Sequence, residues 1–392
     1  MRIAVGLDLA KELHWVTAVD ETGTVRLDQA VPNDPPALDS LVTTLRALPG
    51  EVTIGLDLVR GPATLVTALL LAAGFRLVHV PGLAVNRARE GTVGGERKSD
   101  PRDARVIAEQ VRTRTDLRPL DLGDELLAEI RVLVVRRRDL TADQTRRLAR
   151  LHDLLVTIHP GLERRLDLTT KGALWLLTRY VTPGELRAAG RRRVVAHLRR
   201  AGRVPNVEDL AATALAAAEA QRLAVPGEAL TADLVRELAT EALGLRERLT
   251  RLDQDLEARL ARHPDAALIQ SLPGMGARLT ADLLATAGSF ARFRSADALA
   301  ANAGLAPVVR QSGKSRVVRR ARRGDPALKR VFYQAAFCAL RTPESRAFYE
   351  RKRREGKGHR QAVIALARRR IDVLWAMLQH RTPYQPPLAG AA

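Results

Sequence analysis

The same four-residue sequence, Gly-Leu-Asp-Leu, occurs at residues 6–9 and again at residues 55–58. It places Asp8 at the end of one apolar, strand-like run and Asp57 at the end of another. If the two strands are neighbours in one sheet, both carboxylates emerge at one edge of that sheet. A single aspartate after a strand is more often a surface or turn residue. The repetition is what indicates a shared site.

Two further aspartates lie in the sequence Lys-Ser-Asp-Pro-Arg-Asp-Ala at residues 98–104. Asp100 followed by Pro101 is typical of a helix start, with Asp100 as the cap and Pro101 as the first helical residue. Asp103 then lies in the first turn, where the helix dipole favours a carboxylate. The same spacing puts both aspartates on one helix face. Because a capping role does not exclude a metal-binding role, the local pattern leaves both open.

Carboxylates that converge from two strand ends and a helix start would bind hard divalent cations through oxygen ligands. Two such cations about 3.5–4 Å apart stabilise both the attacking and the leaving oxygen of a phosphodiester. The candidate ligands are Asp8, Asp57, Asp100 and Asp103.

The charge of the chain favours a polyanionic partner. The net charge is +20, and residues 310–370 hold 20 Lys and Arg against four Asp and Glu. Nucleic acid is the partner that fits best. An anionic membrane surface is a weaker alternative, because no strongly amphipathic anchor accompanies the charge. With no signal-peptide pattern and no apolar stretch long enough to span a bilayer, we expect a cytoplasmic protein without a membrane partner.

Hydrophobic periodicity predicts three domains. In residues 1–120 strands alternate with helices, which indicates an α/β domain with some antiparallel strands. Residues 121–262 hold two long helices with coiled-coil-like leucine spacing, and these could form an antiparallel hairpin, an oligomer interface or part of a bundle. Residues 263–392 are predicted to be an all-α domain with a basic tail. The single cysteine, Cys338, excludes a disulfide or a cysteine-based zinc site within one chain.

The sequence Leu-Pro-Gly-Met-Gly at residues 272–276 precedes an apolar-periodic helix, which predicts a helix-hairpin-helix element. Gly274 and Gly276 would let backbone N–H groups at a helix start approach a DNA phosphate closely. A plain helix-turn-helix packing unit is the alternative, because Gly-x-Gly alone is not specific.

A basic loop is predicted around Ser312, with cations on both sides that would bind phosphates. These cations are Arg310, Lys314, Arg316, Arg319 and Arg320. A serine in such a place is more often a turn residue or a phosphate hydrogen-bond donor. A serine nucleophile needs an activating base or metal. The neighbouring sequence offers none, so activation would have to come from the carboxylate domain or from another subunit.

The order of these motifs along the chain resembles the IS110 family of insertion-sequence transposases, which are also called DEDD recombinases. The resemblance rests on the acidic domain, "KSDPRDA", the two long helices, "LPGMG", "GLAP" followed by "SG", and the basic tail. It covers nearly the whole chain. It implies a RuvC-like (RNase H-like) fold for the first domain.

Site residues follow from the resemblance position by position. Asp8 matches the first acid of the family, Asp57 the second, and Asp100 and Asp103 the last two. Ser312 matches the serine that attacks DNA and forms a phosphoserine link. Two departures stand out: the second acid is most often Glu, one methylene longer, and many members have Ser-Ser where this chain has Gln-Ser.

The resemblance also implies the partners of the protein. It implies Mg²⁺ (or Mn²⁺) at the acidic site, and double-stranded DNA of the element ends and the target as substrate. It further implies a structured guide (bridge) RNA, and homodimers that assemble into a tetramer with a composite active site.

Two other functions stay open at this point. A RuvC-like, structure-specific nuclease would need the acids but not Ser312, and would leave free 5′-phosphate ends. An inactive nucleic-acid-binding relative would need only the basic residues.

Overall fold

The computed structural model describes residues 1–58, 61–91, 99–120, 125–312, 315–319, 321 and 323–386. Contacts divide the chain into two compact units, Met1–Asp124 and Glu125–Ala392. Each unit is treated by itself below. The division into three domains stays a prediction.

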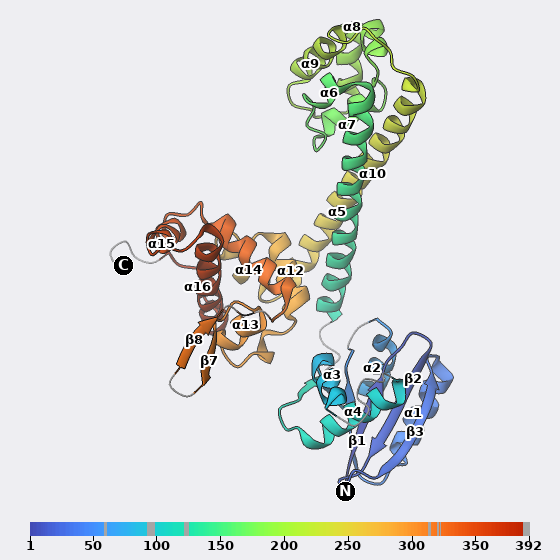
Figure 1. The fold of residues 1–392 in the computed structure, drawn as a ribbon, viewed down its shortest axis with the longest axis vertical. Helices are drawn as coiled ribbons and strands as arrows, with labels where there is room; N and C mark the ends of the chain where they lie inside the picture. Colours follow the sequence, from blue (N-terminus) through green and yellow to red (C-terminus); the bar gives the residue numbers. More distant parts are fainter. Residues whose placement is uncertain are drawn as a thin grey trace. The chain divides into compact units, whose positions relative to one another are not determined.

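The first unit is built on a mixed six-stranded sheet in the order β3-β2-β1-β4-β5-β6 (Figure 1). Strands β1, β4 and β5 run parallel, and β2, β3 and β6 pair with their neighbours in the antiparallel sense. This confirms the predicted α/β class. The elements are β1 (Arg2–Asp8), β2 (Leu13–Val19), β3 (Val25–Pro32), α1 (Pro35–Arg46), β4 (Glu51–Leu56), α2 (Ala63–Ala72), β5 (Arg76–His79), α3 (Gly82–Glu90), α4 (Asp100–Thr113) and β6 (Arg118–Leu120).

Alternation along the central strands separates two faces of the sheet. On β1, Ile3, Val5 and Leu7 pack into a core with leucines of α1 and α2. The residues between them face the other way, where Ala4 contacts Ala108 of α4. Because side chains two apart share a face, Asp8 falls on the α4 side of the sheet.

Two glycines allow α4 to lie directly on the sheet. Gly6 and Gly55 are paired in register on the parallel strands β1 and β4. A methyl group built on Gly6 would lie 2.0 Å from the carbonyl oxygen of Ala104. One built on Gly55 would lie 2.4 Å from Cγ2 of Val111. Both contacts are far inside van der Waals distance, so the helix can pack this closely only where the strands carry no side chain.

The second unit is mostly helical. Its elements are α5 (Glu125–Ile158), α6 (Pro160–Glu163), α7 (Lys171–Leu177), α8 (Pro183–Arg200), α9 (Val207–Glu219), α10 (Glu228–Arg262), α11 (Ala266–Ser271), α12 (Ala277–Ala287), the 3-10 helix η1 (Phe290–Arg292), α13 (Ala296–Asn302), β7 (Val308–Ser312), β8 (Ser315–Arg319), α14 (Pro326–Ala339), α15 (Pro343–Arg354) and α16 (His359–His380).

The long helices α5 and α10 pack side by side and antiparallel (Figure 1). Ion pairs link them in antiparallel register: Arg137 to Asp253 at 2.6 Å and Arg147 to Glu241 at 2.6 Å. Of the arrangements left open by the sequence, the structure shows an antiparallel pair. Coiled-coil geometry itself stays a prediction.

Each end of this helix pair is buried in its own hydrophobic core. One core joins Leu151 and Leu155 of α5 to Val235 and Ala239 of α10, together with residues of α6 to α9. The other joins Ile130 of α5 and Leu256 of α10 to residues of α11 to α16. Figure 1 shows both groups of short helices along the pair. We call the group α6 to α9 the hairpin-tip bundle.

The prediction of an all-α region after residue 262 is wrong in one place. Residues expected to form a basic loop instead form a two-stranded antiparallel sheet, β7 and β8. Val308 and Val309 on one strand, and Val317 and Val318 on the other, are β-branched and favour strands. Among the described residues, no helix is long and apolar enough to cross a membrane.

Candidate active site

The parallel pairing of β1 and β4 brings Asp8 and Asp57 to one edge of the sheet. The register pairs Leu7 with Leu56, so each aspartate occupies the next position on its strand. Neighbouring strands lie about 4.8 Å apart. Both aspartates are half-buried. The two copies of the repeated sequence therefore occupy equivalent positions on β1 and β4. In each copy the glycine lies under α4 and the aspartate lies at the end of the strand.

Asp103 is buried in the first turn of α4, with 7% of its side chain exposed. Arg89 of α3 donates from Nη1 to both carboxylate oxygens, at 2.7 Å and 2.8 Å. The arginine side chain is itself only 12% exposed. A charge-assisted ion pair of this kind holds the carboxylate in one orientation.

Opposing effects act on the charge of the Asp57 carboxyl. Burial raises the pKa of its carboxyl, and the nearby charge of Asp103 raises it further. Backbone N–H groups at Asp57 and Leu58, and the imidazole of His79, lower that pKa. Its Oδ1 atom is buried and has no hydrogen-bond partner within the described part of the chain. The effect of Asp103 shows that these two carboxylates lie close enough to interact.

Asp100 is less buried than the other three aspartates. It is exposed, and it is the first residue of α4 rather than its cap. The helix begins one residue earlier than expected, because the backbone N–H groups of Arg102 and Asp103 donate to the carbonyl of Ser99. Pro101, which has no N–H to satisfy, fits this first turn.

The candidate ligands are of the chemical type that binds a hard divalent cation. Carboxylate oxygens are the preferred ligands of Mg²⁺ and Mn²⁺, and the buried Oδ1 of Asp57 is an oxygen that a cation would satisfy. Within the described residues, however, no group of three or more His, Cys, Asp or Glu side chains is gathered closely enough to hold a metal ion. Instead, Arg89 supplies the positive charge beside Asp103.

Ser312 is the last residue of β7 and pairs in register with Ser315 of β8. It therefore lies at the end of a paired strand, not within an irregular loop. Among the basic residues predicted to surround it, the backbone places Arg310 opposite Val317 and Arg316 opposite Gln311. Arg319 ends β8 and is exposed. Lys314 and Arg320 lie outside the described residues.

The predicted phosphate-binding glycines have different surroundings. Gly274 has φ +83°, and a methyl group built on it would lie 2.4 Å from the carbonyl oxygen of Ala335 in α14. Arg370, which is buried, donates to the carbonyl of Pro273 and fixes the same turn. Gly274 thus has a packing role, and the phosphate contact predicted for it stays a prediction. Gly276 is exposed, and no described atom lies within 4 Å of a methyl group built on it. A phosphate contact at Gly276 stays a prediction.

Comparison of the sequence with known protein families identifies the class of protein. A family model described as a transposase matches residues 5–160, which include all four aspartates. A second, described as the transposase IS116/IS110/IS902 family, matches residues 266–350, which include Ser312. The chain is therefore a transposase.

Close relatives narrow the class to one family. A 42 kDa protein of the insertion element IS900 from Mycobacterium paratuberculosis is 46% identical over 99% of this chain and 98% of its own length. A 44.8 kDa protein of the insertion element IS116 from Streptomyces clavuligerus is 41% identical, over 98% of this chain and 96% of its own. The chain belongs to the IS110 family of insertion-sequence transposases, as the motifs predicted.

Among solved structures, the chain is similar to T. thermophilus RuvC in complex with a Holliday junction substrate. The match covers 31% of this chain and 100% of that one, at 16% identity and a TM-score of 0.25. A likeness this distant carries no conclusion about the present chain, so the RuvC-like fold of the first unit stays a prediction.

Sequence reasoning missed three contributors to this site. Arg89 pairs with Asp103, His79 ends the neighbouring strand β5 and lowers the pKa of Asp57, and Gly6 admits α4. The glycine had a signal, since it stands two residues before the aspartate in both copies of the repeat. No sequence pattern predicts that Arg89 pairs with Asp103, because the two residues lie on different helices and their contact depends on how α3 packs against α4.

Proposed function

We propose that this transposase cuts and rejoins DNA strands at the ends of an insertion sequence through a covalent phosphoserine at Ser312. The observation that carries the proposal is the register of β1 on β4, which puts Asp8 and Asp57 at equivalent strand ends beneath α4. Packing of α4 on Gly6 adds the buried Asp103 to this side of the sheet. An edge of this kind, in a chain of net charge +20, suits chemistry on a phosphodiester.

Asp8, Asp57 and Asp103, with Asp100 at the start of the same helix, would hold Mg²⁺ (or Mn²⁺). When bound, the cation would stabilise negative charge on the phosphate oxygens during strand transfer. To serve as ligands, the carboxylate oxygens of Asp103 must exchange their contact with Arg89. Burial raises the pKa of Asp57, and a bound cation would favour its ionised form.

The serine step follows from the chemistry of a hydroxyl nucleophile. A bond forms between Oγ of Ser312 and phosphorus, and the bond from phosphorus to one deoxyribose oxygen breaks. The hydroxyl proton ends on the departing sugar oxygen. In the reverse step, a sugar hydroxyl of the partner strand attacks the phosphoserine and restores a phosphodiester. The energy of the cut bond is kept in the phosphoserine, so strands can be rejoined without another energy source.

Guidance by a structured bridge RNA, and assembly of dimers into a tetramer, complete the proposal. They rest on the membership of the IS110 family. The four aspartates belong to the first unit and Ser312 to the second, an arrangement compatible with a composite site.

The acidic site is tested by strand exchange on a cognate element end with guide RNA and Mg²⁺. Asp8→Asn, Asp57→Asn and Asp103→Asn should each lower the rate about a hundredfold or more, since a bound cation contributes several kcal/mol of charge stabilisation. DNA binding should persist. Asp39→Asn, the same change at an exposed position on α1, is the matched control. Normal exchange by the site variants would rule out the metal site. Free 5′-phosphate ends in place of rejoined strands would favour a nuclease.

A further inference from the structure

The hairpin-tip bundle carries a basic surface that the proposed active site does not explain. Between residues 187 and 203 the sequence has seven arginines and no acidic residue. Arg187 has a structural role, because it donates to the backbone carbonyls of Ala218 and Gln221 at the end of α9. The other six are exposed; five lie on α8 and one follows its end. We call them the α8 arginines: Arg191, Arg192, Arg193, Arg199, Arg200 and, beyond the helix end, Arg203.

Packing and helix stability do not account for the three arginines at residues 191–193, whereas Arg199 and Arg200 lie in the last turn of α8, where the helix dipole favours cations. Helix α8 is interrupted at Gly190, whose φ is 66°, and the helix restarts at Arg191. Three arginines therefore occupy the first turn of the restarted segment, where the helix dipole disfavours cations. Other positions on α8, Val194 and Leu198, pack into the hydrophobic core. An arrangement that costs local stability in this way points to a role in binding.

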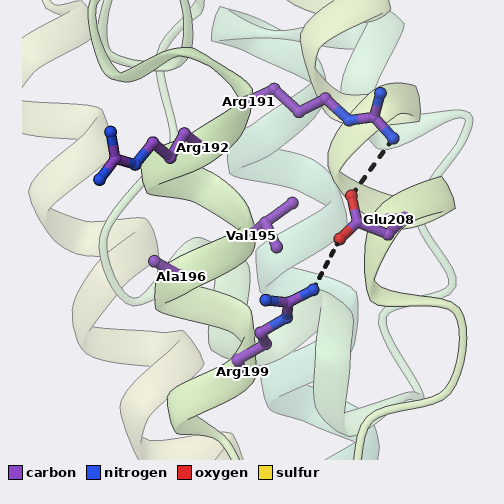
Figure 2. A pocket seen from close by; sticks show the side chains of 6 residues that line it. All are labelled: Arg191, Arg192, Val195, Ala196, Arg199 and Glu208. Carbon is purple, nitrogen blue, oxygen red and sulfur yellow. Dashed lines mark hydrogen bonds and ion pairs between the residues drawn. The ribbon is translucent and has the colours of Figure 1, made fainter.

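Three of these arginines, Arg191, Arg192 and Arg199, line a shallow hollow of about 530 Å³. Figure 2 shows Arg191 and Arg199 pointing from α8 toward Glu208 of α9. The carboxylate of Glu208 lies between them, 3.2 Å from Arg191 Nη2 and 3.0 Å from Arg199 Nη2. The two arginine side chains stay 63% and 69% exposed. A phosphate group, with two free oxygens, can take the place of such a carboxylate.

Four of the α8 arginines lack even this partial neutralisation. Within the described residues, the side chains of Arg192, Arg193, Arg200 and Arg203 are exposed and make no hydrogen bond or ion pair. Arg192 and Arg200 lie on the same helix as the pair held by Glu208. The surface therefore presents positive charge at two places along α8, around residue 192 and around residue 200.

We propose that the α8 arginines bind the phosphate backbone of duplex DNA on both sides of a major groove. Eight residues separate Arg192 from Arg200, or about 12 Å along a helix axis. The major groove of B-DNA is also about 12 Å wide. The deep, narrow major groove of A-form RNA fits this spacing less well. The choice of DNA as partner rests on the proposed function.

Single-stranded nucleic acid is the weaker candidate. Binding of single strands relies on aromatic side chains on which bases stack. Two aromatic residues pack on His197 of α8. Trp175 stacks on its ring with centroids 5.8 Å apart and donates to its carbonyl, and the buried Tyr180 meets the ring edge-on with centroids 5.4 Å apart. Both are already used in packing the bundle.

The test measures binding of the full-length protein to labelled duplex DNA over a range of salt concentrations. For Arg192→Gln with Arg200→Gln, the slope of log K against log salt should become shallower by about 2, since each phosphate contact contributes about 0.9. Arg248→Gln with Arg251→Gln removes the same charge from exposed positions on α10. Its slope should stay close to that of the wild type. Equal changes in the two double variants would overturn the proposal.

A gain-of-binding variant separates the proposal from misfolding. Glu208→Gln releases Arg191 and Arg199, so DNA binding should tighten and its salt slope should steepen. Unchanged or weaker binding would contradict the role given to these two arginines. A loss for duplex RNA but not for duplex DNA in the Arg192 and Arg200 variant would overturn the assignment to DNA. Because binding needs no strand cleavage, this inference and the proposed chemistry at Ser312 can fail separately.

Discussion

Arg89 and Asp103 form a two-pronged ion pair between α3 and α4, with Arg89 Nη1 2.7 Å and 2.8 Å from the two carboxylate oxygens. Both side chains are almost fully buried. The pair fixes the orientation of the most buried of the four aspartates. It also neutralises a carboxylate that the proposed function assigns to a metal ion.

Replacing Arg89 should therefore lower the free energy of unfolding and make that free energy depend on Mg²⁺. Arg89→Gln leaves Asp103 buried without its counter-ion, a change that typically costs about 3–5 kcal/mol. Denaturant unfolding with and without Mg²⁺ measures it, and Mg²⁺ should stabilise the variant more than the wild type. Adding Asp103→Asn to Arg89→Gln should recover part of the stability. A double variant as unstable as the sum of the two single variants would argue against a direct pairing.

Gly6 is expected to tolerate no side chain. In Gly6→Ala the new methyl group would meet the carbonyl oxygen of Ala104 at 2.0 Å, so α4 must move off the sheet. We expect a loss of about 3 kcal/mol or more in the free energy of unfolding, at the upper end of overpacking effects. Gly276→Ala, which meets open space, is the control. Comparable stability of the two variants would contradict the close packing of α4.

These residues show what the sequence could and could not reveal. The repeated Gly-Leu-Asp-Leu pointed to Asp8 and Asp57, because a period of two on parallel strands has a direct structural meaning. Asp103 was found from its motif, but its pairing with Arg89 depends on how α3 meets α4. At Ser312, the density of arginines suggested a loop, although flanking valines carry the strand signal of the β7–β8 hairpin.

Asp57 is expected to reduce stability at neutral pH. Its pKa in the folded protein is raised by burial, so folding favours the protonated form. The folded state is favoured most below the ordinary pKa of 3.8, and this advantage is lost as pH rises through the folded-state pKa. Without metal at pH 7, Asp57→Asn should be more stable than the wild type, by on the order of 1 kcal/mol. The difference should shrink on acidification. A less stable variant at pH 7 would contradict this sign.

His159 should make the hairpin-tip bundle sensitive to acid. It is fully buried, its Nδ1 lies 2.9 Å from the carbonyl of Val181, and burial lowers its pKa. On acidification, His159 therefore becomes protonated in the unfolded chain before it does in the folded chain. The free energy of unfolding then decreases as pH falls below about 6.5. Unfolding of the wild type and of His159→Gln at pH 7 and pH 5 compares the two losses. An equal loss in both would exclude His159 as the source.

The central claim, that Ser312 attacks DNA, is tested most directly by trapping the covalent intermediate. The measurement is the yield of protein–DNA adduct on a cognate element end for the wild type, Ser312→Ala and Ser315→Ala. Ser315 is the register partner of Ser312 on β8, so its replacement makes the same chemical change in the same hairpin. The account predicts adduct with the wild type and Ser315→Ala, and none with Ser312→Ala. Adduct formation by Ser312→Ala would contradict it.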